Sequence, residues 1–291
     1  MSTPTNAPLI PCLDLVTAKL DAIHHRYDHR ETLAGYSTGL IDLDAMTAGF
    51  KPGCFNIIAS SPAMGKSAFL IFLLQAFSVQ KHYPSVFFSL QQQSSAMIEM
   101  LLVCVAKIDA NRIRTGHLHA NDFAHLNQAA AEVAAAPIHF SDNLFSLSDI
   151  AESCRQLAQT AVGLKFVFVD DADTLFFAGD ADVVSENRAQ FCQHMQKLAR
   201  ELNLCVFVSL TVERSAEKRK NKRPLLSDLP RQMEQSHIVD FVAFLYRDEY
   251  YDPETTARGE VEIIIAKHRH GPIGTVDALF QASCHRFLNR S

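Results

Sequence analysis

The chain has 291 residues, of which 48% are apolar and 20% charged, a composition typical of a soluble globular protein with one large α/β domain and an appendage. No apolar run approaches the length of a membrane span, and the start MSTPTNAPLIPCLDL contains no basic leader, so we expect a cytoplasmic protein without membrane contact. Seven cysteines without a Cys-x-x-Cys pair argue against a zinc site or a disulfide framework, and the net charge of −5 argues against a surface that is basic overall.

The predicted elements begin with a short disordered tail and one amphipathic helix within residues 1–30, because apolar residues recur at helical spacing between Leu13 and Tyr27. From residue 31 to 291 we expect one domain in which β-like runs alternate with helical patterns, as in α/β folds with a mostly parallel sheet flanked by helices. The predicted strands are Phe55–Ser60, Ser85–Leu90, Lys165–Asp170, Cys205–Leu210, Phe241–Tyr246, Glu260–Lys267 and Gly274–Phe280. The predicted helices are Lys66–Gln80, Ser95–Lys107, Asp122–Ala135, Asp149–Thr160 and Glu186–Leu202.

The segment SSPAMGKS at 60–67 matches the phosphate-loop pattern G-x-x-x-x-G-K-[ST] at every constrained position except the first, where Ser60 replaces glycine. It follows an apolar run and opens a helical one, so backbone N–H groups and the helix N-terminus would hold a phosphate. Lys66 would reach the β- and γ-phosphates of ATP, and the Ser67 hydroxyl would bind Mg²⁺. The predicted ATP-binding residues are Ser60, Ser61, Pro62, Ala63, Met64, Gly65, Lys66 and Ser67. A chance Gly-Lys-Ser turn is the alternative interpretation.

The second half of this site is predicted at FVFVDD, residues 166–171, an apolar strand that ends in aspartate. Asp170 would hold the water shell of Mg²⁺, so Ser67 and Asp170 are the predicted metal-side residues. A buried strand that ends in a solvated acidic turn is the alternative. The two motifs together indicate a P-loop ATPase.

Longer segments resemble the ATPase domain of replicative DnaB-type helicases, which have a RecA-like P-loop NTPase fold. They are STGLIDLDAMTAGFKPG at 37–53, SSPAMGKSAF at 60–69, ARELNLCVFVSL at 199–210, KRPLLSDL at 222–229, FLYRDEYYDP at 244–253 and IIIAKHRHGPIGTV at 263–276. The resemblance implies a hexameric ring, in which residues 13–27 form the linker helix on a neighbouring subunit and Lys267 and Arg269 enter the next subunit's ATP site. The family's separate N-terminal domain has no counterpart in the chain.

The chain departs from the family pattern where the strand at 85–90 ends. In the family this strand ends in Ser-Leu-Glu, and the glutamate polarises the attacking water, whereas this chain has Gln91. An amide cannot accept a proton, and this kind of catalysis is typically worth about 10²–10⁴-fold, so we expect ATP binding with slow hydrolysis. Asp171 is either a replacement acid or a solvated residue at the strand end. The predicted catalytic residues are Gln91, Asp170, Asp171, Lys267 and Arg269.

The basic run RSAEKRKNKR at 214–223 is the predicted nucleic-acid segment. In a ring such runs would line a channel and attract the backbone of single-stranded DNA in a salt-dependent way, and a solvated surface loop is the alternative. Thr211 stands where the family has a glutamine that senses the γ-phosphate, and it is too short for that bridge. The segment 230–233 also departs from the family's Arg-Glu-Ser-Gly. The predicted DNA contacts are Arg214, Lys218, Arg219, Lys220, Lys222, Arg223 and Arg231.

Two functions remain open at this point. The chain is either a working ring helicase that couples ATP hydrolysis to duplex unwinding, or a hydrolysis-poor paralogue that binds ATP as an accessory or regulatory module. The ring would consist of this chain alone or of a mixture with a full-length helicase. ATP turnover and its stimulation by DNA separate the two functions.

Overall fold

A nine-stranded sheet lies at the centre of the computed structural model, which describes residues 9–28, 33–143, 146–176, 181–212, 214–234 and 237–290. The strand order is β3-β2-β4-β5-β1-β6-β7-β8-β9. The first six strands in this order pair in parallel, and β7, β8 and β9 extend the sheet as antiparallel strands. The bounds are β1 Phe55–Ser60, β2 Ser85–Ser89, β3 Ile138–Ser141, β4 Phe166–Asp170, β5 Cys205–Thr211, β6 Phe241–Tyr246, β7 Glu260–His268, β8 Gly274–Gln281 and β9 Arg286–Asn289.

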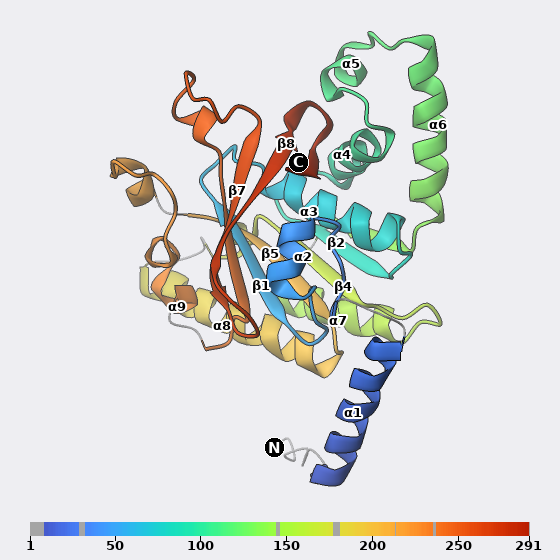
Figure 1. Ribbon diagram of the computed structural model, residues 1–291, viewed down its shortest axis with the longest axis vertical. Coiled ribbons are helices and arrows are strands. Elements are labelled where there is room, and N and C mark those ends of the chain that lie inside the picture. Colours follow the sequence, from blue (N-terminus) through green and yellow to red (C-terminus); the bar gives the residue numbers. More distant parts are fainter. Residues whose placement is uncertain are drawn as a thin grey trace.

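Helices cover both faces of this sheet (Figure 1). The α-helices of the described residues are α1 Cys12–Asp28, α2 Ile41–Thr47, α3 Lys66–Leu74, α4 Ser94–Ala106, α5 Ala110–Thr115, α6 Ala120–Ala135, α7 Leu147–Ala158, α8 Ala181–Glu201 and α9 Arg231–Glu234. A π-helical turn, η1 Gln75–Val79, continues α3, and short 3₁₀ turns are η2 Ala172–Leu175, η3 Arg214–Lys218, η4 Leu226–Asp228, η5 Asp248–Tyr250 and η6 Ala282–Cys284. No helix in the described ranges is long and apolar enough to cross a membrane.

The alternation of side chains along the central strands builds two hydrophobic cores. In β4, Phe166 and Phe168 pack on the side of α3 and α4, whereas Val167 and Val169 pack on the side of α7 and α8. The ring of Phe168 stacks on Phe207 of β5 with centroids 5.5 Å apart. Successive strand residues point to opposite faces, so a strand buried on both sides must be apolar throughout. The central parallel strands therefore contain few polar residues.

The predicted α/β fold with a mostly parallel sheet is confirmed, and all seven predicted strands are present with bounds shifted by at most one residue at either end. The predictions omitted β3 and β9, which have only four residues each and lie at the two edges of the sheet, where burial is partial. They also omitted α2, α5 and α9, which have seven, six and four residues, too few to show a helical period. The helix predicted from Glu186 begins at Ala181.

The predicted N-terminal helix is present as α1, which projects away from the body of the molecule (Figure 1). Its apolar residues Leu13, Val16, Leu20 and Ile23 are exposed. The predicted disordered tail lies largely in residues 1–8, outside the described residues. An exposed apolar stripe of this kind needs a partner surface.

Candidate functional site

The predicted phosphate loop connects the end of β1 to the start of α3. Gly65 has a φ of 102°, and a Cβ atom there would lie 3.3 Å from the Phe280 ring, so only glycine fits without strain. Ser60 is buried at the end of β1, and its hydroxyl donates a hydrogen bond to the Ser61 carbonyl at 2.7 Å. Ser60 is not among the residues with positive φ. The position that departs from the motif therefore accommodates serine.

Lys66 lies buried at the start of α3 and faces the end of β4. Its positive charge acts on the carboxyl groups of Asp170, Asp171 and Asp173. The Ser67 side chain, one residue further along α3, is close enough to Asp170 to lower the pKa of its carboxyl. The two predicted halves of the nucleotide site thus meet at one point, because the parallel strands β1 and β4 have their carboxyl ends on the same side of the sheet.

Asp170 is 1% exposed and accepts a hydrogen bond from the Ser209 hydroxyl at 2.6 Å. Burial and the neighbouring charge of Asp171 raise its pKa to about 6, although hydrogen bonds from Ser209 and Ser67 and the charge of Lys66 oppose them. A carboxylate this poorly compensated gains from a cation. Asp170 is therefore poised to interact with one.

Asp171 has a φ of 55°, which is rare for a residue other than glycine. Its backbone N–H donates to the Ser209 hydroxyl at 2.8 Å, and its carbonyl accepts from Thr174 at 3.0 Å. Burial raises the pKa of its carboxyl, and the charge of Lys66 opposes this. The left-handed backbone is thus held on both sides, with the carboxyl close enough to Lys66 to feel its charge.

Asp173 belongs to the same cluster, and the sequence analysis missed it. The residue is 9% exposed, and its carboxylate accepts the Thr211 backbone N–H at 2.6 Å. Burial raises its pKa, while the hydrogen bonds with Thr211 and the charge of Lys66 lower it. The only signal in the sequence was the spacing of acids in DDAD at 170–173, which does not reveal that η2 turns the last one back toward β5.

Gln91 follows β2, whose last residue Ser89 lies opposite Asp170 in the parallel register. Its side chain is exposed. A pocket beside it is lined by Leu90, Gln91, Gln92, Gln93, Ser95, Asp142 and Asn143. Asp142 is the only acid in this lining, and its carboxylate accepts the Ser94 backbone N–H at 2.6 Å, at the start of α4. The Asp142 carboxylate is thus bound to the start of α4, and the lining contains no other carboxylate.

The residues at this point suit Mg²⁺. Asp170 and Ser67 offer oxygen ligands, which Mg²⁺ prefers, and Mg²⁺ usually keeps several waters and phosphate oxygens around few protein ligands. The Ser89 hydroxyl, buried beside Asp170, has no hydrogen-bond partner among the described residues. In the described part of the chain, no group of three or more His, Cys, Asp or Glu side chains could hold a metal by itself. A bound ion would thus depend on nucleotide oxygens or water.

The turn after β6 also contacts the phosphate loop, which the sequence analysis did not predict. Arg247 donates to the Ala63 carbonyl at 3.3 Å and pairs with Glu249. Its guanidinium lies 4.8 Å from the centroid of the Phe280 ring, the ring that also packs against Gly65. The segment FLYRDEYYDP thus lies at the nucleotide loop.

Lys267 and Arg269 lie at the opposite ends of the strands from the phosphate loop. β6 starts beside β1, with Phe241 opposite Asn56, and β7 runs back antiparallel so that Lys267 lies opposite Val242. Both basic residues are therefore near the start of β1, whereas the phosphate loop follows its end, and a six-residue strand spans about 17 Å. They cannot serve the phosphate loop of their own chain.

The two basic residues interact with groups of their own chain at these strand ends. Arg269 forms an ion pair with Asp240 at 2.9 Å and donates to the His237 carbonyl. Asp240 is 4% exposed and also accepts the Phe55 backbone N–H at 3.0 Å. Burial and the charge of Arg269 lower the pKa of Lys267, and Asp240 opposes this. Asp240 thus orients the Arg269 side chain.

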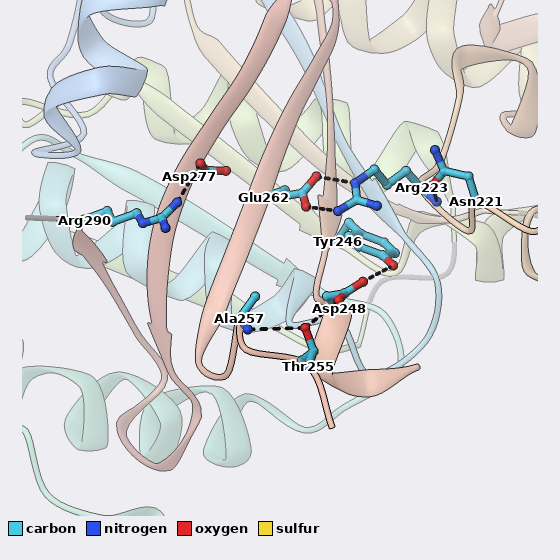
Figure 2. Close-up of polar contacts among 9 residues, drawn as sticks. All are labelled: Asn221, Arg223, Tyr246, Asp248, Thr255, Ala257, Glu262, Asp277 and Arg290. Atoms are coloured by element: carbon cyan, nitrogen blue, oxygen red, sulfur yellow. Dashed lines mark hydrogen bonds and ion pairs between the residues drawn. The ribbon is translucent and has the colours of Figure 1, made fainter. Parts of the chain in front are cut away.

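The basic run at 214–223, called the basic segment below, is partly bound within the chain. Arg219 donates two hydrogen bonds to Asp228, both at 2.6 Å. Arg223 pairs with both oxygens of Glu262 on β7 (Figure 2). Both carboxylates are shielded from water: Asp228 is 3% exposed, and the Glu262 side chain is 22% exposed. These two arginines hold the segment on the domain.

The other predicted DNA contacts differ in their surroundings. Lys218, Lys220 and Arg231 are exposed, and Lys222 lies over the ring of Tyr251 with 4.4 Å to the centroid. The side chain of Arg214 lies outside the described residues. Sequence reasoning could not distinguish the exposed lysines from the two paired arginines, because their partners are distant in sequence or in another element.

Comparisons with known proteins agree over nearly the whole chain. A family model described as "DnaB-like helicase C terminal domain" matches residues 35–289. The chain is 32% identical to "Replicative DNA helicase DnaC" of Bacillus subtilis over 278 residues and 32% identical to "Replicative DNA helicase DnaB" of Geobacillus stearothermophilus over 281 residues. Each match covers 95% of this chain and 61% of the relative, so the chain spans about three fifths of their length.

Solved structures give the same result. One of them, the structure of an ATPase domain, has a TM-score of 0.86 at 31% identity, with 95% of this chain and 99% of that chain covered. "The Structure Of A DnaB-Like Replicative Helicase And Its Interactions With Primase" has a TM-score of 0.86 at 31% identity, with 99% of this chain and 68% of that chain covered. The fold is therefore that of RecA-like DnaB ATPase domains.

Proposed function

Because the chain belongs to the family of DnaB-like helicase C-terminal domains, we propose that it binds ATP and Mg²⁺ between the subunits of a ring and single-stranded DNA in the channel of that ring. In this proposal ATP hydrolysis drives duplex unwinding, at a rate limited by Gln91. The observation that carries it is the meeting of the phosphate loop with the end of β4, where Lys66 and Ser67 lie against Asp170.

The nucleotide would be held mainly by the phosphate loop. The backbone N–H groups at the start of α3 and the Lys66 ammonium attract phosphate oxygens. Ser67 and Asp170 would hold Mg²⁺, which when bound neutralises charge on the phosphates. The raised pKa of Asp170 supports this role, because a nearby cation favours the ionised carboxylate.

A ring with shared sites is supported by the position of Lys267 and Arg269. They lie at the ends of the strands away from the phosphate loop of their own chain, so in this proposal they act on a site in a neighbouring subunit. An arginine supplied in this way stabilises charge on the transferred phosphoryl group. The exposed apolar stripe of α1 would cover part of a neighbouring subunit. The ring would be a hexamer, formed by this chain alone or with a full-length helicase.

Single-stranded DNA would contact the exposed lysines of the basic segment. Lys218 and Lys220 are free to meet phosphates, whereas Arg219 and Arg223 set the path of the segment through their carboxylate partners. Contacts to phosphates carry no sequence information, so binding would be sequence-tolerant and weakened by salt.

A second function is favoured by the surroundings of Gln91. The amide cannot take a proton from water, and Asp142, the acid in the same pocket, caps α4 instead. Asp171 is the remaining candidate for a general base, with its backbone held in an unusual conformation beside Lys66. If Asp171 does not act, the protein binds ATP with little turnover and works as an accessory or regulatory module.

The test is steady-state ATP turnover with and without single-stranded DNA, together with nucleotide affinity. We expect low turnover in the wild type, a rise of about tenfold or more in Gln91→Glu, and a change of less than about twofold in the matched control Gln92→Glu. Strong DNA-stimulated turnover that Asp171→Asn abolishes would instead identify Asp171 as the base and the protein as a motor. Failure of the wild type to bind ATP would refute both functions.

A further inference from the structure

One turn of the chain contacts both the phosphate loop and the basic segment. This turn, residues 246–251, starts at the last residue of β6 and contains η5; it is called the bridging segment here. On the nucleotide side, Arg247 donates to the Ala63 carbonyl at 3.3 Å. Burial raises the pKa of the Tyr251 hydroxyl, and the nearby Ser61 side chain opposes this. Two residues of the bridging segment thus meet two residues of the phosphate loop.

The other side of the bridging segment meets the basic segment. The Tyr251 hydroxyl donates to the Glu217 carboxylate at 3.4 Å, and the Lys222 ammonium lies 4.4 Å from the centroid of the Tyr251 ring. The Arg223 guanidinium lies 4.5 Å from the centroid of the Tyr246 ring while it pairs with Glu262 (Figure 2). Tyr251 is therefore in contact with one residue in each half of the basic segment.

The bridging segment has the internal contacts of a rigid connector. Figure 2 shows the Tyr246 hydroxyl donating to Asp248, at 2.8 Å, and Thr255 donating to the same carboxylate, at 2.7 Å. The rings of Tyr246 and Tyr251 stack with centroids 5.9 Å apart. Tyr251 is half-buried against the core that also contains the start of α3. A displacement at one end can thus reach the other without being absorbed by free rotation.

We propose that Tyr251 is a positioning residue that couples nucleotide binding at the phosphate loop to DNA binding at the basic segment. A phosphate in the loop would shift Ser61, and the Tyr251 hydroxyl shared with Glu217 would change its partner. The Glu217 and Lys222 contacts would then set the exposed Lys218 and Lys220 in a different position relative to a phosphate backbone. The inference rests on the proposed function, because coupling exists only if both ligands bind.

A connection through Tyr251 would stand in for one through Thr211. Thr211, at the end of β5, has a short side chain, and its backbone N–H is bound to Asp173. Thr211 itself therefore offers no long side chain that could reach from the nucleotide to the basic segment. Coupling between two ligands is reciprocal, so DNA must change nucleotide affinity by the same factor as nucleotide changes DNA affinity.

The experiment measures four affinities on the full chain. These are the affinities for the non-hydrolysed analogue ATPγS with Mg²⁺, in the absence and presence of an oligothymidylate, and for the oligothymidylate, in the absence and presence of the analogue. In the wild type we expect the analogue to tighten DNA binding about fivefold or more. In Tyr251→Phe, which keeps the ring under Lys222 and removes the hydroxyl, the factor should fall below about twofold while each separate affinity changes less than about twofold.

Two further variants separate coupling from general damage. Tyr250→Phe removes a neighbouring hydroxyl that makes no hydrogen bond to another described residue, and its coupling factor should match the wild type. Tyr251→Leu removes both the hydroxyl and the ring, so hydrogen exchange of residues 216–223 should rise in this variant and not in Tyr250→Phe.

The outcomes are distinct. Tyr251→Phe with the full coupling factor would overturn the inference, and so would a wild type that binds both ligands without coupling. Unchanged hydrogen exchange in Tyr251→Leu would show that the bridge does not hold the basic segment, which also overturns it. A wild type that binds neither ligand would refute the proposed function itself.

Discussion

Replacement of Asp170 by asparagine should stabilise the protein in the absence of nucleotide and Mg²⁺. Burial and the charge of Asp171 raise the pKa of Asp170 from 3.8 to about 6. A difference of about two pKa units corresponds to about 3 kcal/mol of destabilisation above pH 6, where the carboxyl is ionised in both the folded and unfolded states. Asparagine removes this charge. It keeps one acceptor for the Ser209 hydroxyl, and the weaker hydrogen bond costs about 1 kcal/mol.

The pH dependence gives the sharper test. Because the folded pKa is the higher one, the native state binds a proton more tightly than the unfolded state, and the penalty falls as pH falls through 6. Between pH 8 and pH 5 it should fall by about 1.4 kcal/mol. The gain in Tm of Asp170→Asn over the wild type should thus be larger at pH 8 than at pH 5, by about 3–5 °C. Thermal unfolding of the wild type and Asp170→Asn in EDTA measures the gain in Tm at each pH.

Asp228→Asn is the matched control. Asp228 is also buried, and burial acts to raise its pKa, but hydrogen bonds from Arg219 and the Leu225 N–H outweigh burial and lower it. Its stabilising contribution is fully present above its unfolded pKa and is lost as pH falls from there through its lower folded pKa. Both pH 5 and pH 8 lie above this interval, so the variant should lose about 2 kcal/mol equally at the two pH values. The reasoning about Asp170 is wrong if Asp170→Asn destabilises the protein by the same amount at both pH values.

Three other substitutions test the loop and the basic segment. Gly65→Ala should lower the free energy of unfolding by about 2 kcal/mol and abolish nucleotide binding, because a φ of 102° strains alanine, as thermal unfolding and titration with ATPγS would reveal. Lys220→Ala should reduce the slope of log affinity for single-stranded DNA against log salt by about one, whereas Arg219→Ala should lower stability because it leaves the buried Asp228 without its ion pair. An equal loss of stability in both variants would contradict the distinction drawn between exposed and paired basic residues.

The sequence by itself determined the fold class and the position of the phosphate-loop pattern between a strand and a helix. Strands such as β4 are apolar on both faces and the phosphate-loop pattern is local, so each could be identified from neighbouring residues alone. The short edge strands β3 and β9 were not predicted, because four partly buried residues show too little alternation of apolar and polar side chains. The roles predicted for Gln91, Asp171 and the basic residues remain predictions.

Only the tertiary structure decided which charges are paired. Arg223 pairs with Glu262 of β7, which is 39 residues away in the sequence. Asp173 turns back to the end of β5 because η2 follows the left-handed backbone of Asp171. The contact of Tyr251 with both ligand segments arises in the same way, from the packing of a turn against two distant loops. Such pairings depend on where strands are placed in the sheet, and sheet order is a property of the folded chain that no local pattern encodes.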